Sequence, residues 1–309
     1  MVRHFLSIED LSTDTLWFLW GLTRWLKQSP ERFAHELTGH TLALIFQKPS
    51  TRTRVSFEVA MLQLGGQAIV LNARDLQLGR GETIADTARV LSRYVHGIVA
   101  RVFDHTDLVT LAQYARVPVI NGLSDRLHPC QALADLYTIL ERFGRVSGIR
   151  LAYVGDGNNV CHSLLLAGSR VGMHITVASP EGYTPGEDIV ARACEYAAAS
   201  GGSIRITHDP SEAVRDAHVV YTDVWASMGQ EAEHAARVRV FRPYQINAQL
   251  MALADSQAVF MHCLPAHRGE EVTDDVLDSP ASIVWDQAEN RLHTQKALLL
   301  WVFQRVGGP

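Results

Sequence analysis

Short apolar runs alternate with helix-patterned stretches along most of this chain, and that alternation limits the fold more than any other feature. The first series predicts strands at residues 42–46, 68–71, 96–102 and 117–120, and helices at residues 51–64, 84–94 and 131–143. An earlier helix, capped by Ser12 or Thr13, should end near Ser29-Pro30. Strands that alternate with helices predict a parallel sheet covered on both faces.

A second series of strands begins at Ile149, and a last amphipathic helix is predicted at residues 295–305. Its strand-like runs lie within residues 149–157, 173–179, 203–209, 218–227, 258–269 and 282–291. The predicted fold class is therefore α/β, with two tandem parallel-sheet α/β domains. We expect a first domain over residues 1–145, on which the helix at 292–309 packs back, and a second over residues 146–291.

Composition narrows the class of protein. The 309 residues are 47% hydrophobic and 20% charged, which argues against disorder and against a membrane protein. A net charge of −5 offers no basic footprint for nucleic acid. The four cysteines form no CxxC pair, and the N-terminus has no secretory apolar segment, so we expect a reduced, cytoplasmic setting.

The segment from Ser50 to Arg54 (STRTR) joins the first strand to the next helix. Free N–H groups and the helix dipole favour an anion there, and a guanidinium binds phosphate oxygens with paired donors. The same residues also fit a simple helix N-cap with solvated arginines. This stretch alone does not choose between the two.

Many residues whose side chains can bind ligands or take part in catalysis lie at or just beyond the carboxyl ends of the predicted strands. They are Ser50–Thr53, Arg101, His128–Gln131, Asn159, Asp223–Met228, Cys263-Leu264 and Arg291. In open α/β sheets, ligands bind at that edge. Two sheets whose functional edges face each other would form one interdomain active-site cleft.

The run from Gly155 to Val160 (GDGNNV) is similar to the start of a dinucleotide fingerprint, with Glu181 near the position of a ribose-binding acid. Val160 replaces the third glycine, however, and a tight turn explains the other two. NAD binding is therefore a minor alternative.

His128 and Gln131 lie one turn apart at a helix start, where they could bind a carbonyl oxygen and an NH2 group. A capping histidine with a surface glutamine is the simpler explanation of the motif by itself. A metal site is a third interpretation, but no histidine or cysteine pair has zinc spacing, so we predict none.

His262-Cys263-Leu264-Pro265 follows a buried-looking strand. A nucleophilic cysteine would need a histidine partner. In an extended chain His262 points to the face opposite Cys263, which argues against thioester chemistry.

Taken together, these motifs resemble the transcarbamylase family over essentially the whole chain. The resemblance is carried by FQKPSTRTRVSFE, LGRGETIADTARVLSR, HPCQALADL, GDGNNVCHS, DVWASMGQE, HCLPAHRGEEVTD and AENRLHTQKALL. Their order matches the family's order.

The resemblance implies that carbamoyl phosphate binds first, with residues of the first domain around it. Its phosphate would be held by Ser50, Thr51, Arg52, Thr53 and Arg101, and its carbonyl oxygen polarised by Thr53, Arg101 and His128. Gln131 and the backbone of Cys263 and Leu264 would bind its amide, and Arg291 would reach in from the second domain. Arg101, His128 and Cys263 are the implied catalytic residues.

The resemblance also implies L-ornithine as the second substrate, held by Asn159, Asp223, Ser227 and Met228. Gln77 would come from a neighbouring subunit, which implies a homotrimer with shared sites. No metal or organic cofactor, nucleic acid or membrane is implied. The expected role is in arginine metabolism.

Three alternatives remain open at this point. A transcarbamylase could use another amine: aspartate, putrescine or an N-acylated ornithine. The chain could also be a non-catalytic ligand-binding regulatory protein on the same scaffold, although Arg52, His128 and Arg291 argue against that. A dehydrogenase is the third.

Overall fold

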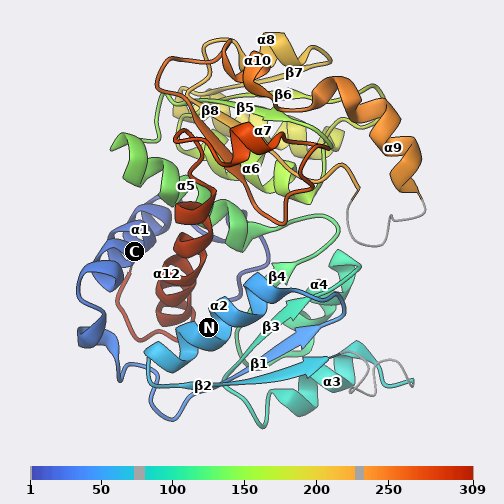
Figure 1. The fold of residues 1–309 in the computed structure, drawn as a ribbon. Helices are drawn as coiled ribbons and strands as arrows, with labels where there is room; N and C mark the ends of the chain where they lie inside the picture. The colour runs from blue at the N-terminus through green and yellow to red at the C-terminus, as the bar shows by residue number, and fades with distance from the viewer. Residues whose placement is uncertain (1, 73–80, 227–232, 309) are drawn as a thin grey trace. The chain divides into compact units, whose positions relative to one another are not determined.

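The computed structural model describes residues 2–72, 81–226 and 233–308, and its chain divides into two compact units. The first unit comprises Met1–Tyr137 and Glu289–Pro309, and the second comprises Thr138–Ala288. Each unit is built on its own parallel sheet (Figure 1). The predicted fold class is confirmed.

The first sheet has the strand order β2-β1-β3-β4, with all pairs parallel. Its strands are β1 (Thr41–Phe46), β2 (Gln67–Asn72), β3 (Gly97–Arg101) and β4 (Val119–Leu123). All of β1 except its first residue is buried, as expected for a parallel strand covered on both faces.

Within the described residues 2–72 and 81–143, α-helices and 3-10 turns connect these strands. They are η1 (Ile8–Asp10), α1 (Thr13–Gln28), η2 (Pro30–Phe33), α2 (Thr51–Gln63), α3 (Ile84–Leu91), α4 (His105–Tyr114) and α5 (Pro129–Phe143), which continues into the second unit. Ser12 caps α1 and accepts a hydrogen bond from the N–H of Thr15. Side chains of α3 and α4, such as Ala88 and Leu108, pack with Ile98 of β3 in one apolar core.

The second sheet has the order β7-β6-β5-β8-β9, again entirely parallel. Its strands are β5 (Arg150–Val154), β6 (His174–Ala178), β7 (Ser203–Thr207), β8 (Val219–Thr222) and β9 (Val259–His262). Its helices are α6 (Asn159–Arg170), α7 (Glu187–Ser200), α8 (Pro210–Val214), α9 (His234–Phe241), α10 (Ala248–Met251) and α11 (Asp274–Leu277), with the turn η6 (Arg242–Tyr244). Helices α6 and α7 pack together, and the α8 to α11 segment forms a separate apolar core with the sheet.

The prediction of a strand within residues 282–291 is wrong. Helix α12 (Val284–Val302) begins there, and Ser282 makes only an isolated bridge with Phe260. The buried positions Val284, Gln287, Arg291 and Thr294 recur at helical spacing, but three of these four residues are polar. Hydrophobic periodicity therefore missed the first half of this helix.

No helix among the described residues combines the length and the apolar character that crossing a membrane requires.

Candidate active site

In the first unit, the predicted phosphate-binding residues lie where two adjacent strands lead to opposite sides of the sheet. Strand β1 connects to β2 on one side, and its other neighbour β3 connects to β4. At such a switch point the two following loops diverge and leave a crevice beyond the carboxyl ends. Residues 50–53 follow β1, and Arg101 is the last residue of β3.

The N-terminus of α2 is arranged for an anion. Ser50 is the N-cap, and its hydroxyl accepts a hydrogen bond of 3.3 Å from the N–H of Thr53. The first turn of α2 contains no acidic residue. Its positive dipole end is therefore not offset by a nearby carboxylate within the helix.

Arg291 lies in the middle of α12, not at the end of a strand as predicted. Its guanidinium is buried and donates to the hydroxyl of Thr53 at 3.2 Å and to Oε1 of Gln131 at 2.6 Å. Gln131 in turn donates to Oδ1 of the buried Asp135 at 2.8 Å. One network therefore fixes Arg291, Thr53 and Gln131 relative to one another inside the first unit.

His128 is buried just before α5, and its environment keeps the ring neutral at pH 7. Burial holds its pKa well below the usual value of 6.5, and the positive charges of Arg291, Arg101 and Arg52 lower it further. The guanidinium groups of all three arginines thus lie close enough to His128 to affect its pKa. Such an environment suits a phosphate dianion beside a neutral hydrogen-bonding ring.

Cys130, between His128 and Gln131, has a structural role. Its thiol is buried and donates to the carbonyl of Asn121 at 3.3 Å. Burial raises its pKa to about 12. This buried, hydrogen-bonded thiol therefore fits a packing role and not that of a nucleophile.

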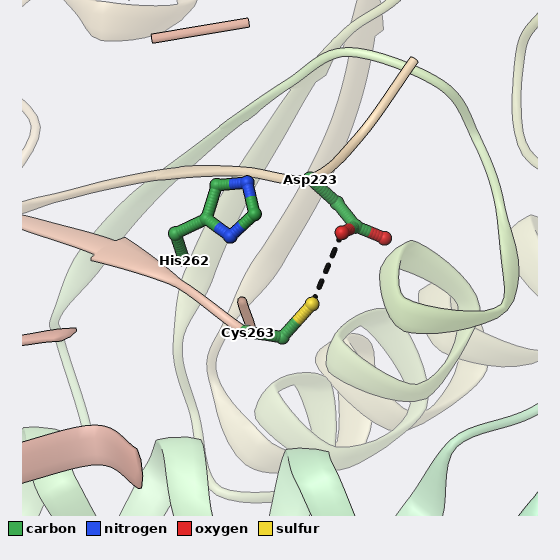
Figure 2. A group of neighbouring side chains, drawn as sticks. All are labelled: Asp223, His262 and Cys263. Atoms are coloured by element: carbon green, nitrogen blue, oxygen red, sulfur yellow. Dashed lines mark hydrogen bonds between the residues drawn. The ribbon is translucent and has the colours of Figure 1, made fainter. Parts of the chain in front are cut away.

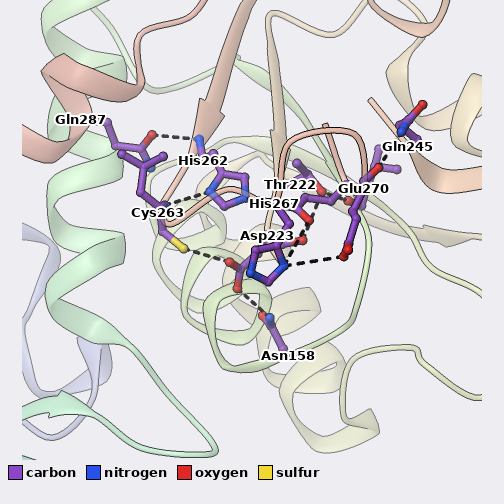
Figure 3. Close-up of polar contacts among 12 residues, drawn as sticks. Asn158, Thr222, Asp223, Gln245, His262, Cys263, His267, Glu270 and Gln287 are labelled. Atoms are coloured by element: carbon purple, nitrogen blue, oxygen red, sulfur yellow. Dashed lines mark hydrogen bonds and ion pairs between the residues drawn. The ribbon is translucent and has the colours of Figure 1, made fainter. Parts of the chain in front are cut away.

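In the second unit the switch point lies between β5 and β8, and Asp223 immediately follows β8. Its carboxylate, 6% exposed, accepts from Nδ2 of Asn158 at 2.7 Å and from the thiol of Cys263 at 3.0 Å (Figures 2 and 3). These two donors fix the orientation of the Asp223 carboxylate. The oxygen lone pairs that they leave unused therefore point in a fixed direction. A carboxylate held in this way can accept hydrogen bonds from an amine.

Asn158 was not among the predicted site residues, yet it links two features of the second unit. Its Oδ1 caps α6 by accepting from the N–H groups of Val160 and Cys161, at 3.0 and 3.2 Å. Its Nδ2 binds Asp223. An asparagine directly before a helix was the signal that could have identified it.

The prediction that His262 and Cys263 point to opposite faces is wrong, because a ring nitrogen of His262 lies within 4.8 Å of the Cys263 sulfur. The imidazole of His262 is fully buried; its Nε2 lies 3.2 Å from Oε1 of Glu271, and its Nδ1 accepts from the N–H of Leu264 at 2.8 Å. Because Nδ1 accepts, Nε2 carries the proton that is donated to Glu271. Leu264 has a φ of +59°, a conformation that residues with a side chain rarely adopt outside functional sites.

The ligand atoms of Asp223, His262 and Cys263 lie within 4.8 Å of one another, which raises the question of a metal site. Both ring nitrogens of His262 already have protein partners. A metal would have to displace one of those buried hydrogen bonds. The contacts of this group fit a positioning role for Asp223 better than metal binding.

The remaining predicted residues are placed as follows. Asn159 is the first residue of α6, and Thr51 is the exposed first residue of α2. Gln77, Ser227 and Met228 lie outside the described residues. Asp135 and Glu271 join Asn158 as site residues that the sequence did not reveal. Asp135 is one helical turn after Gln131, a spacing that was visible in the sequence.

The glycines of the dinucleotide-like run have a local explanation. A side chain at Gly157 would meet backbone atoms of Pro185 and Thr184 at 2.2 and 2.4 Å. In a dinucleotide-binding fold the pyrophosphate approaches the second glycine. Here the chain itself takes that space, which argues against NAD.

Comparisons with known proteins cover both units of the chain. Residues 3–141 match the family model for the carbamoyl-P binding domain of aspartate/ornithine carbamoyltransferase, and residues 147–302 match the model for its Asp/Orn binding domain. The anabolic ornithine carbamoyltransferase of Pyrococcus furiosus is 60% identical, over 97% of this chain and 96% of that protein.

Two solved structures are similar over nearly the whole chain. The ornithine carbamoyltransferase from Pyrococcus furiosus has a TM-score of 0.95 and 59% identity, covering 99% of this chain and 98% of that one. A mutant of N-acetyl-L-ornithine transcarbamylase has a TM-score of 0.87 and 34% identity, covering 97% of this chain and 100% of that one.

Proposed function

The chain belongs to the aspartate/ornithine carbamoyltransferase family, and we propose that it transfers the carbamoyl group of carbamoyl phosphate to the δ-amine of L-ornithine. The products are L-citrulline and phosphate. The observation that carries this proposal is the buried His128, on which the positive charges of Arg52, Arg101 and Arg291 act, together with the hydrogen bonds of Arg291 to Thr53 and Gln131. The relatives' names, of which the first is an anabolic ornithine carbamoyltransferase, support arginine biosynthesis as the role.

Carbamoyl phosphate is assigned to the first unit. The N-terminus of α2, Arg52 and Arg101 bind its phosphate, since N–H groups and guanidinium donors match phosphate oxygens. Thr53, Arg101 and His128 polarise its carbonyl, and Gln131 binds its amide group. Arg291 orients Thr53 and Gln131 for these tasks through its two hydrogen bonds.

The amine is assigned to the second unit. Asp223, held by Asn158 and Cys263, orients the ornithine amine by accepting its hydrogen bonds. Asn159, Ser227 and Met228 complete the assigned ornithine-binding set, and the backbone of Cys263 and Leu264 is assigned to the carbamoyl amide.

The chemistry requires a neutral amine. Removing the proton from an alkylamine with a pKa near 10.4 costs roughly 4 kcal/mol of free energy at pH 7.4. Positive charge around the phosphate disfavours the protonated amine and so offsets part of this cost. The amine nitrogen forms a bond to the carbonyl carbon, and negative charge develops on the oxygen, where donors already in place stabilise it. The C–O bond to phosphate then breaks, and phosphate leaves with the amine's proton.

We assign the working form as a homotrimer in the cytoplasm, with Gln77 supplied by the neighbouring subunit. None of the four cysteines, all of which lie in the described part of the chain, forms a disulfide, which is compatible with a reducing compartment.

The test is to measure carbamoylated product and phosphate from carbamoyl phosphate, with L-ornithine, aspartate, putrescine and N-acetyl-L-ornithine offered in parallel. Turnover with L-ornithine alone is expected. Turnover with another amine would keep the carbamoyl phosphate assignment and overturn the amine assignment. Tight carbamoyl phosphate binding without turnover would favour a regulatory protein.

A further inference from the structure

A second group of potential metal ligands lies in the second unit, apart from the residues assigned above. His234 is the first residue of α9, and His267 and Glu270 belong to the loop after β9. Nε2 of His234 lies 3.1 Å from Oε2 of Glu270, and Nδ1 of His267 lies 3.7 Å from the same oxygen. Figure 3 shows His267 and Glu270 side by side.

These separations match the edges of a zinc coordination tetrahedron. Zinc binds histidine nitrogen and carboxylate oxygen at about 2.0–2.1 Å, which places neighbouring ligand atoms about 3.4 Å apart. The observed distances of 3.1 and 3.7 Å lie on either side of that value. All three ligand atoms lie within 4.8 Å of one another. Small side-chain rotations would therefore complete the geometry.

The loop that carries two of the three ligands is held in place by its own hydrogen bonds. The N–H of Glu270 donates to the carbonyl of His267 at 2.9 Å, and Gly269 has a φ of +84° that permits the tight turn. The N–H of His267 donates to the buried carboxylate of Glu271. The backbone of His267 and Glu270 is thus held in place before any ion binds.

Neighbouring residues brace the same loop from the segment that follows α9. Nε2 of Gln245 donates to the carbonyls of Gly269 and Glu270, each at 2.8 Å. Nη1 of Arg242 donates to the carbonyl of Gly269 at 3.0 Å. Braced ligands cost less entropy to organise, which favours metal affinity.

We propose that His234, His267 and Glu270 bind one divalent transition-metal ion of the zinc class. Two imidazoles and one carboxylate are a common three-ligand set for zinc, and water would take the fourth position. The ion takes no part in carbamoyl transfer. It would fasten the first turn of α9 to the loop after β9 and stabilise this side of the second unit.

The alternative is a plain histidine–glutamate contact at the surface, since the three side chains are 30–45% exposed. Both descriptions explain the short distance between His234 and Glu270. A simple contact between His234 and Glu270 does not require His267 nearby, whereas the metal site requires it as the third ligand.

The experiment is calorimetric titration of the metal-free, full-length protein with Zn²⁺, together with thermal unfolding with and without the ion. One Zn²⁺ per chain and a higher Tm are expected. His234→Ala and His267→Ala should each weaken binding by about tenfold or more and abolish the Tm shift. Both side chains are partly exposed, so the variants should fold.

Two control variants separate this site from others. His174→Ala removes a histidine that contacts Ser203 and no carboxylate, and should leave binding unchanged. Cys263→Ser tests the group around Asp223 and should also leave binding unchanged. The proposal is overturned if Zn²⁺ does not bind, if binding survives His234→Ala, or if it is lost in Cys263→Ser.

Discussion

Burial lowers the pKa of His128, and three guanidinium groups lower it further. The neutral ring can then hydrogen-bond to a polarised carbonyl without adding a fourth positive charge to this group of residues. The same feature makes a prediction about stability, because a group whose pKa differs between the folded and unfolded states links folding to pH.

The sign of this linkage follows from proton uptake. Below pH 6.5 the unfolded chain protonates His128 and the folded chain does not, so the contribution of His128 to stability falls as the pH falls. Between pH 7.5 and 5.5 the wild-type protein should lose about 1 kcal/mol more unfolding free energy than His128→Asn. Urea unfolding at fixed protein concentration measures the difference. Equal losses in both proteins would contradict the prediction.

Arg52 and Arg54 provide a matched pair on α2. Arg52 belongs to the charge cluster around His128, whereas Arg54 forms an exposed ion pair with Glu58 at 3.4 Å. Losing paired charge-assisted hydrogen bonds to phosphate should weaken carbamoyl phosphate binding by about 100-fold or more in Arg52→Ala. Arg54→Ala should bind nearly normally. Calorimetric titration with carbamoyl phosphate measures the affinity of both variants. Unchanged affinity in Arg52→Ala would refute the assignment of Arg52 to the phosphate.

Cys263 is assigned as a residue that positions Asp223, not as a nucleophile. A serine at this position can still donate to the carboxylate of Asp223, whereas an alanine cannot. Cys263→Ser should therefore keep activity within about tenfold of wild type, and Cys263→Ala should lose more. Mass spectrometry of the working enzyme should find no carbamoylated thiol. A trapped Cys263 adduct would reverse this role.

At the residue scale, the sequence suggested the assigned charged and polar side chains better than the residues that hold them in place. Arg52, His128 and Asp223 belong to recognisable motifs, so their positions were predicted. Asn158 and Glu271 act through contacts with Asp223 and His262. His262 and Glu271 are nine residues apart, and only the path of the folded chain brings them together.

At the element scale, the N-cap of α6 connects helix stability to Asp223, which is assigned to the amine. Asn158→Ala should lower the unfolding free energy by about 1 kcal/mol through loss of the cap. It should also lower kcat/KM for ornithine about tenfold or more, because Asp223 loses a donor. Asn247 caps α10 through the N–H of Leu250, so Asn247→Ala should show a similar stability loss without the kinetic one. Equal kcat/KM values for ornithine in Asn158→Ala and Asn247→Ala would show that the contact between Asn158 and Asp223 is not functional.

Helix α12 shows why one element was mispredicted. It begins with Val284 and Trp285, directly after Ile283, and these types favour strands; its buried face carries Gln287, Asn290 and Arg291. A polar buried face gives no hydrophobic period, so pattern analysis finds only the apolar C-terminal half. The polar face exists because Arg291 and Gln295 form hydrogen bonds within the first unit, with Thr53 and Ser56 respectively.

At the scale of the whole molecule, both units share one feature: some assigned residues follow the strands at the switch point of a parallel sheet, residues 50–53 and Arg101 in the first unit and Asp223 in the second. The alternation of strands and helices predicted two such sheets, and the structure confirms them. The strand orders were not predictable, because local sequence does not determine which neighbour a buried strand selects. The assignment of binding domains to residues 1–145 and 146–291 stays a prediction.

The proposed trimer makes a prediction that no single variant can test. If Gln77 acts in the site of a neighbouring subunit, Gln77→Ala and Arg101→Ala subunits can complement each other. Random cyclic trimers mixed in equal amounts would have both wild-type residues in about one quarter of sites. Mixing the two inactive variants under subunit-exchanging conditions should therefore restore about that fraction of activity.

The matched control for this mixing experiment pairs Arg101→Ala with Arg52→Ala. Both arginines act on His128 within the same unit of one chain, so no mixed site can contain the two wild-type residues together. This mixture should stay inactive while native mass spectrometry shows that mixed trimers have formed. Recovery in both mixtures would point to reversion or wild-type contamination. Mixed trimers of the Gln77 and Arg101 variants without recovery would mean that each subunit builds its site alone, and Gln77 would lose its assigned role.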